Sequence, residues 1–351
     1  MNTLLIILTL VFSVVSYFPA TRITHWTFRI FDYIRIQILV IQVILLILLS
    51  IYYEEGNTLF LSSLIFLVLT IIYQSFIIFP YLPTYNLFKK PPQADNTISV
   101  ISVNVLQSNT QYDRLIKLIN EVQPDILLTL ETNKDWEIAL EEIESNYKHV
   151  HKAPKENRYG LHFYTKLDVE YINEHYFVTD DRPAIEAHLL DTNGNDFVFL
   201  GIHPPPPAPT EKPTSKQKDA EFMRVAKLVR ELKSPSIVTG DFNNVCWSRS
   251  ARLFASVANL QDSRLGKGIH GTFPVRPIFM RFPLDLLFSS EEIQVHNIKT
   301  LRDIGSDHLP FFCEFSVVTS SFSKATKLDS ELEEKVDEII EEGDNAVEEE
   351  E

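Results

Sequence analysis

Polar side chains that can bind a metal ion or transfer a proton end, or directly follow, several short apolar runs of this 351-residue chain. They are Asn104, Glu131, His203, Asp241, Asn243, Asp285, Asp307 and His308. Carboxylate and amide oxygens are ligands for hard cations, and an imidazole exchanges a proton near neutral pH. Taken singly, each residue is more often a turn, a cap or a structural hydrogen-bonding group, so the interpretation depends on the whole set.

The apolar runs before these residues predict strands, whose ends are rigid positions for a functional group. Strands are expected at residues 97–105, 125–130, 160–164, 184–190, 197–202, 236–239, 284–288 and 311–315, and helices at 114–122, 136–145 and 216–232. Strands and helices alternate without a regular βαβ order. This favours a layered α/β sandwich over a barrel.

The order of the motifs from about residue 97 to 316 resembles the endonuclease/exonuclease/phosphatase superfamily, which includes DNase I-like nucleases, sphingomyelinases and inositol-polyphosphate phosphatases. The matching segments are SVNV, DILLTLET, YGLHFYTK, GIHPPPP, GDFNN, PLDLLF and GSDHLP. GDFNN and GSDHLP, in this order and at this separation, are the most specific pair. Trp247 and Ser248, with Arg182-Pro183-Ala184, look like a branch that is often found behind amino-terminal membrane helices. The resemblance implies a DNase I-like, four-layer α/β sandwich of two packed mixed sheets with outer helices.

The resemblance also implies a divalent metal, Mg2+ or Mn2+. Glu131 is then the main ligand, Asn104 beside it holds the metal or a phosphate oxygen, and Asp307 is a further ligand. Hydrolysis of a phosphodiester needs such a cation because the transition state concentrates negative charge on the phosphate oxygens.

The same resemblance assigns catalytic roles to five residues. His308 is expected on the scissile phosphate, oriented by Asp285, whose carboxylate raises an imidazole pKa. Asp241 orients or deprotonates the attacking water, and Asn243 and His203 donate hydrogen bonds to a phosphate oxygen. Whether Asp241 or His308 is the general base is left open.

Three uncharged apolar runs precede this domain, at residues 4–18, 36–52 and 58–81. Each is close to the roughly 20 residues that a membrane-spanning helix requires, and no polar stripe interrupts them. We therefore expect three transmembrane helices and contact with the lipid bilayer through residues 4–81. A cleaved signal peptide is the alternative for the first run, but no Lys or Arg precedes it.

Flanking cations predict the orientation of this multi-pass membrane segment. Arg22, Arg29 and Arg35 separate the first two runs, whereas Glu54 and Glu55 separate the second from the third. The positive-inside rule then places the catalytic domain in the cytoplasm.

The chain is expected to divide into a membrane segment at residues 1–82, a proline-rich linker at 83–96, the catalytic domain at 97–320 and an acidic, disordered tail at 321–351. The net charge is −15 for the whole chain. The middle segment keeps an excess of acids when the ends are set aside, which argues against broad, non-specific binding of duplex nucleic acid.

Three functions remain open on this basis. The leading one is a membrane-anchored, metal-dependent phosphodiester hydrolase acting on nucleic acid or another phosphodiester. A second is a sphingomyelinase-like enzyme that cleaves a lipid head group or a soluble phosphate ester. A third is a non-catalytic scaffold that keeps the fold; the presence of Glu131, Asp241, Asn243 and His308 counts against it, since a degenerate relative is expected to lose one of them.

Overall fold

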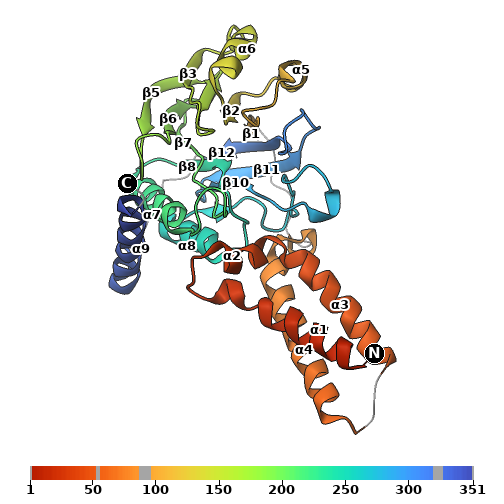
Figure 1. Cartoon of the computed structure of the whole chain (residues 1–351). Coiled ribbons are helices and arrows are strands. Elements are labelled where there is room, and N and C mark those ends of the chain that lie inside the picture. The colour runs from red at the N-terminus through yellow and green to blue at the C-terminus, as the bar shows by residue number, and fades with distance from the viewer. Residues whose placement is uncertain (1, 53–55, 87–95, 319–326, 350–351) are drawn as a thin grey trace.

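Two packed mixed β-sheets form the globular part of the protein, and a stem of apolar helices projects from it (Figure 1). The computed structural model describes residues 2–52, 56–86, 96–318 and 327–349. The first sheet has the order β11 (Ile293–Thr300), β12 (Phe311–Val317), β1 (Ile98–Asn104), β2 (Ile126–Leu130), β4 (Leu161–Thr165) and β3 (His149–Ala153). The second has the order β5 (Asp168–His175), β6 (Ala184–Leu190), β7 (Asp196–Ile202), β8 (Ser236–Asp241), β10 (Asp285–Ser289) and β9 (Gln261–Asp262).

Helices cover the outer face of each sheet, which gives four layers. On the first sheet lie α5 (Tyr112–Val122) and α6 (Lys134–Glu144), which bury Leu115, Ile119 and Trp136 against it. On the second lie α7 (Lys216–Glu231) and α8 (Arg249–Ala258), whose apolar faces bury Phe222 and Phe254. A third apolar cluster fills the space between the sheets. Each sheet is therefore buried on both faces, which explains why the central strands are almost continuously apolar.

The expected two-sheet α/β fold is confirmed, and each strand and helix predicted for the globular part is present. The sequence did not indicate β3, β5, β9, β11 or α8. Strand β5 lies at the edge of its sheet and is mostly exposed, and β9 has only two residues. Neither therefore has the apolar run that indicates a strand.

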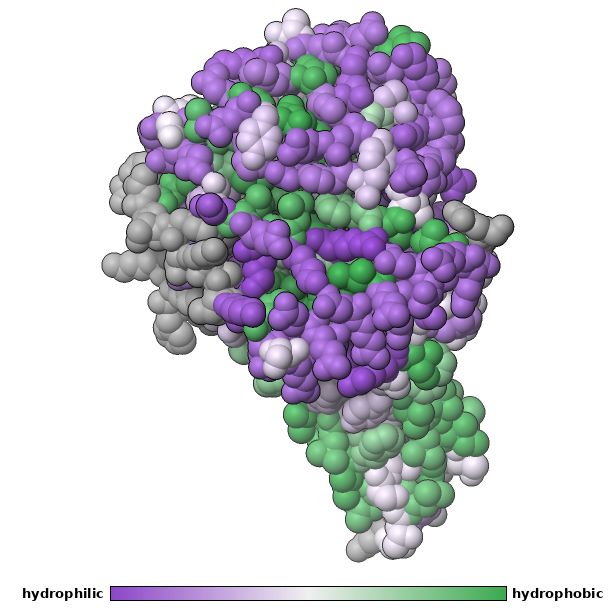
Figure 2. Space-filling model, turned by 90° about the vertical axis from the view of Figure 1, so that its left-hand side faces the viewer, coloured by the Kyte–Doolittle hydropathy of each residue, from purple (hydrophilic) through white to green (hydrophobic). Residues whose placement is uncertain are grey.

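The apolar stem contains α1 (Asn2–Val15), η1 (Phe18–Ala20), α2 (Trp26–Tyr33), α3 (Arg35–Ile51) and α4 (Thr58–Ile78), followed by η2 (Phe79–Tyr81) and η3 (Pro83–Asn86). Its surface is largely apolar, in contrast to the polar surface of the globular part (Figure 2). Two segments are long and apolar enough to cross a membrane, Thr3–Ala20 and Thr58–Tyr81.

The expectation of three full transmembrane helices needs correction. Helix α3 has 17 residues and meets α2 at a bend of 70°. The described chain thus has two candidate spans, and a third only if the bent pair α2–α3 is one span. The two candidate spans support association with a membrane, while the multi-pass topology and the cytoplasmic orientation stay predictions.

Backbone hydrogen bonds, such as those from Gly266 N to Pro80 O and from Gly268 N to Tyr81 O, join the stem to the globular domain, and four further bonds involve a side chain. Trp247 Nε1 donates to Asp32 O at 2.9 Å, and Tyr81 Oη donates to Cys246 O at 2.9 Å. Gln37 Nε2 donates to Phe279 O, and Tyr33 Oη donates to Asn243 O at 2.7 Å. In three of these four bonds the partner in the globular domain is Asn243, Cys246 or Trp247, in the segment that follows β8. The stem therefore holds that segment in place.

The acidic tail is not disordered over its described part, contrary to expectation. Residues 330–348 form α9 (Ser330–Glu348), which packs along α7 (Figure 1). Asp344 pairs with Arg224 at 2.7 Å, Asp337 pairs with Lys227, and Val336 is fully buried. Apolar residues at helical spacing among the acids supply the buried stripe. Of the predicted linker, residues 83–86 form η3 and residues 87–95 lie outside the described chain.

The close approach of α9 to α7 depends on Gly343. A Cβ at Gly343 would lie 2.2 Å from the Cβ of Ala220. We expect Gly343→Val to separate the two helices, at a cost of about 1–3 kcal/mol for overpacking. Hydrogen exchange of residues 330–348 should then speed up, whereas Glu341→Val on the exposed face should change it little. Equal protection in both variants would contradict this packing.

Candidate active site

The eight predicted site residues converge where the ends of strands from both sheets meet. Strand β1 runs parallel to β2, and β7 runs parallel to β8, so each pair ends at one edge. Seven of the residues line a cavity of about 400 Å³: Asn104, Glu131, His203, Asp241, Asn243, Asp307 and His308. The eighth, Asp285, lies directly behind His308. The structure thus brings together every residue of the predicted set.

Asn104 links the two acids nearest to it. Its Nδ2 donates to Glu131 Oε1 at 2.8 Å and to Asp241 Oδ2 at 3.1 Å, while its Oδ1 accepts from Leu106 N. The other oxygen of Glu131, Oε2, accepts from Gln107 N at 3.1 Å. Glu131 has a φ of +63°, a left-handed conformation that a non-glycine residue adopts only when its surroundings enforce it. The Glu131 carboxylate is therefore held in a fixed orientation.

A buried histidine separates two buried acids. Asp241 and Asp285 are directly opposite each other in the antiparallel pair β8–β10. His308 Nδ1 lies 2.9 Å from Asp285 Oδ2, and its Nε2 lies 3.5 Å from Asp241 Oδ2. Like charges opposite each other destabilise a sheet, so the imidazole ring is the group that makes this pairing tolerable. The predicted contact between Asp285 and His308 is present.

These acids set the protonation state of His308. Burial alone lowers the pKa of its imidazole, but the opposing effect of Asp285 and Asp241 is larger and raises the pKa to about 10. At neutral pH the ring is therefore a cation. Because folding raises this pKa, the stability it contributes is present below the ordinary value of 6.5 and is lost as the pH rises toward about 10.

Asp241 is the acid that faces the cavity. Burial raises its pKa, but His308 and His203 together with hydrogen bonds from Asn243 N and Asn104 hold the pKa below the ordinary value. His203 Nε2 is 3.8 Å from Asp241 Oδ2, and its buried Nδ1 has no hydrogen-bond partner among the described residues. Asn243 Nδ2 donates to Pro204 O at 3.0 Å.

Several supporting residues were not found by sequence reasoning. The buried guanidinium of Arg264 donates to Asp285 O, and Thr272 Oγ1 accepts from Asp285 N at 3.3 Å. Ser306 Oγ donates to Asn104 O at 2.8 Å and accepts from His308 N at 3.0 Å. Ser306 thereby connects the end of β1 to the loop that carries His308. Only the position of Ser306 next to Asp307 in the sequence could have suggested its role.

Glu131 fits a divalent cation better than the buried cluster does. Among the described residues, Asp241, Asp285 and His308 place ligand atoms within 4.8 Å of one another. A protonated imidazole offers no lone pair, so this cluster is already neutralised by its own cation. By contrast, no Lys or Arg of the described chain lies within ion-pair distance of Glu131. Asp307 is exposed on the same cavity and forms no ion pair with a Lys or Arg of the described residues.

An apolar wall forms part of the cavity lining, beside Arg158, Tyr159 and Glu211, and comes partly from the stem. Trp26, Ile30 and Tyr33 of α2 line it, at a spacing that places them on one helical face. The proline loop 206–209, which follows His203 in the sequence, and Phe273, Phe282 and Leu284 line it as well. Helix α2 was not predicted, because it lies in the connection between two apolar runs.

A strand-end site of carboxylates, amides and histidines between two packed sheets defines a class of phosphoester hydrolases. The family model described as "Endonuclease/Exonuclease/phosphatase family" matches residues 84–308 of the sequence. The chain belongs to this family, whose members hydrolyse phosphoesters and generally use a divalent metal. No curated protein matches the sequence.

Solved structures share the fold. The human Nocturnin catalytic domain with a bound sulfate anion is 20% identical with a TM-score of 0.54, and the match covers 66% of this chain and 100% of that one. Humanized D. rerio TDP2 with 14 mutations and D. rerio TDP2 complexed with a single-strand DNA product are each 17% identical with a TM-score of 0.52. Both matches cover 64% of this chain and 100% of the other.

Removal of His308 should expose the repulsion between the two acids. We expect His308→Gln to lower the free energy of unfolding at pH 7 by about 3 kcal/mol or more, because it leaves an uncompensated buried charge. Adding Asp285→Asn to that variant should recover part of the loss. Thermal unfolding of the two single variants and the double variant in detergent measures this coupling. Additive losses would show that the two side chains do not stabilise each other.

Proposed function

We propose that the protein is a divalent-metal-dependent phosphodiester hydrolase whose cavity receives an amphiphilic substrate at a membrane surface. The observation that carries this proposal is the cavity itself. Its lining combines Glu131, Asp241 and His308 with apolar side chains, some of which the stem contributes through α2. The polar residues suit a phosphate, and the apolar ones suit the apolar part of a lipid.

Glu131 and Asp307 would hold Mg2+ or Mn2+, and Asn104 would orient Glu131 through its amide nitrogen. The Oδ1 of Asn104 is engaged by Leu106 N, which favours this positioning role over direct ligation. When bound, the metal supplies a positive charge that offsets the charge on the phosphate oxygens and the leaving oxygen. Two acidic ligands are sufficient because Mg2+ retains several of its waters.

The remaining groups would act on the substrate and on water. Asp241, whose carboxylate is ionised at neutral pH, would accept a hydrogen bond from the attacking water and orient it. His308 would donate from Nε2 to a phosphate oxygen and stabilise its charge, with Asp285 holding Nδ1. His203 and Asn243 would complete the set of donors around the phosphate.

The apolar wall favours a lipid phosphodiester over nucleic acid as the substrate. Trp26 follows the candidate span Thr3–Ala20 by six positions, so the wall begins close to the edge of the bilayer. Nucleic acid is the second candidate, supported by the shared fold of D. rerio TDP2 in its complex with single-strand DNA. The acidic character of the globular domain counts against it, because nucleic-acid affinity depends on phosphate contacts with Lys and Arg.

The metal assignment is tested by Glu131→Gln. The amide keeps the shape of the side chain but removes the charge, so turnover with Mg2+ should fall by orders of magnitude while the unfolding temperature changes little. The matched control is Glu291→Gln, an exposed residue outside the cavity. Turnover is measured on bis-p-nitrophenyl phosphate with and without EDTA. Undiminished activity of the variant, or of the wild type in EDTA, would contradict the assignment.

The substrate class is tested by Ile30→Glu in the full-length protein. A charge on the apolar wall should lower kcat/KM for a phosphodiester lipid in vesicles by about tenfold, since burial of an Ile side chain contributes about 1.5–3 kcal/mol. The loss for bis-p-nitrophenyl phosphate should be smaller, and Ile138→Glu on exposed α6 should affect neither. Preferential cleavage of single-stranded DNA, or equal losses for both substrates, would contradict a lipid substrate.

A further inference from the structure

A second cavity, dominated by basic residues, borders α2 and the segment before it. It encloses about 110 Å³ and is lined by side chains from the segment before α2 and from α2, α7, α8 and α9. Its charged residues are Arg22, Arg29, Lys216, Arg249 and Lys335 with Asp219, Glu338 and Glu342. These eight residues together have a net charge of +2, whereas the whole chain has a net charge of −15.

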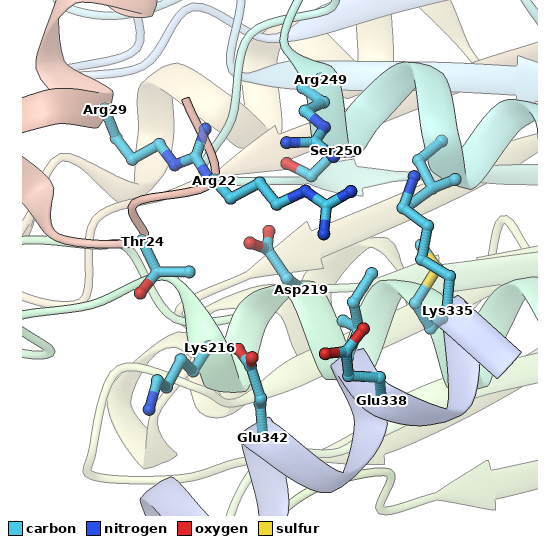
Figure 3. A pocket seen from close by; sticks show the side chains of 13 residues that line it. Arg22, Thr24, Arg29, Lys216, Asp219, Arg249, Ser250, Lys335, Glu338 and Glu342 are labelled. Atoms are coloured by element: carbon cyan, nitrogen blue, oxygen red, sulfur yellow. The ribbon is translucent and has the colours of Figure 1, made fainter. Parts of the chain in front are cut away.

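The acids of this cavity do not neutralise its cations. Arg22, Lys216, Arg249 and Lys335 make no side-chain hydrogen bond or ion pair within the described parts of the chain. In Figure 3 the side chain of Arg22 lies between Asp219 and Arg249. Asp219 Oδ2 accepts from Ser215 Oγ at 2.7 Å, while its buried Oδ1 accepts no hydrogen bond there.

The cations repel one another. The pKa of Arg249 is lowered most by burial and next by the neighbouring positive charges of Arg22 and Arg29. The pKa of Lys335 is lowered most by burial and next by the positive charges of Arg249 and Arg22. A self-repelling cluster of this kind is stabilised by an anion that binds between its members.

The backbone around the cavity is rigid and adds to its positive potential. Ser215 N donates to Thr24 O at 2.9 Å, and Trp26 N donates to Pro213 O at 3.0 Å, so the segment with Arg22 is fixed against the start of α7. The first turns of α7 and α8 both face the cavity through Lys216, Asp219, Arg249 and Ser250. The amino-terminal ends of helices carry partial positive charge and attract anions.

The position of the cavity identifies the source of the anion. Arg22 follows the end of the candidate span Thr3–Ala20 by two residues. Lipid phosphates lie within several ångströms of the hydrocarbon edge, and basic pockets at that depth bind anionic head groups. Met223, Leu253 and Ile339 form the apolar part of the lining.

We propose that this cavity binds the phosphate head group of an anionic bilayer lipid through Arg22, Arg249 and Lys335. The ligand fastens the globular domain to the membrane surface at a site separate from the candidate active site. Of the α2 residues, Arg29 lines this cavity, whereas Trp26, Ile30 and Tyr33 line the other one. The inference is independent of the proposed catalytic activity.

The test is native mass spectrometry of the full-length protein in detergent with phosphatidylglycerol, phosphatidylcholine or inorganic phosphate added. The wild type should retain phosphatidylglycerol in preference to phosphatidylcholine. Arg249→Gln/Lys335→Gln should weaken phosphatidylglycerol binding by about tenfold or more, since a basic residue near a membrane surface contributes about 1 kcal/mol. Arg22→Gln, in an exposed position, should weaken it in the same direction.

The matched control is Arg252→Gln/Arg276→Gln. It removes the same charge from exposed residues that line two other cavities, one of them beside Phe76 and Pro80 of the stem. This control should bind phosphatidylglycerol as the wild type does. Equal binding by the pocket variants and the control would overturn the proposal. Binding of inorganic phosphate as tight as that of the lipid would overturn the assignment to a bilayer lipid.

Discussion

The imidazolium of His308 between Asp241 and Asp285 is the interaction on which the geometry of the site depends. The two acids belong to paired strands of the second sheet, whereas His308 lies three residues before β12 of the first sheet. Their attraction therefore acts across the boundary between the sheets as well as within the site. In a low-dielectric interior, two acids at this separation would not both stay ionised without a cation between them. The ring keeps Asp241 charged and directed toward the cavity, where Asn104 joins it to Glu131.

The stem holds the two candidate membrane spans and also contributes to the cavity of the candidate active site. Helix α2 is short and contributes side chains to both cavities. Trp26, Ile30 and Tyr33 face the cavity of the candidate active site, and Arg29 faces the basic cavity. Tyr33 also donates to the carbonyl of Asn243, so movement of α2 would be transmitted to the loop after β8. This arrangement gives a physical reason for the apolar stem and the globular domain to occur in one chain.

The sequence predicted several strand ends well because some of the functional residues directly follow an apolar run of strand length. Glu131 after DILLTL and Asp241 after SIVTG are examples. Supporting groups such as Arg264 and Thr272 could not be predicted, since their roles arise from contacts between segments distant in the chain. Helix α9 was missed for a different reason, since its acidic composition is typical of a solvated tail. Its few apolar residues, such as Val336, indicate a packed helix only when α7 is there to cover them. The run at residues 36–52 was predicted as a full span, because composition does not show the bend between α2 and α3.

The protonation state of His308 is the most direct test of the central interaction. The 15N chemical shifts of the ring nitrogens are measured in the full-length protein with labelled histidine, in detergent at pH 7.5, and are assigned by their loss in His308→Gln. Both nitrogens should carry a proton and show imidazolium shifts, because the flanking acids raise the pKa of the ring to about 10. One protonated and one bare nitrogen, as in a neutral tautomer, would contradict the arrangement of an imidazolium between Asp241 and Asp285.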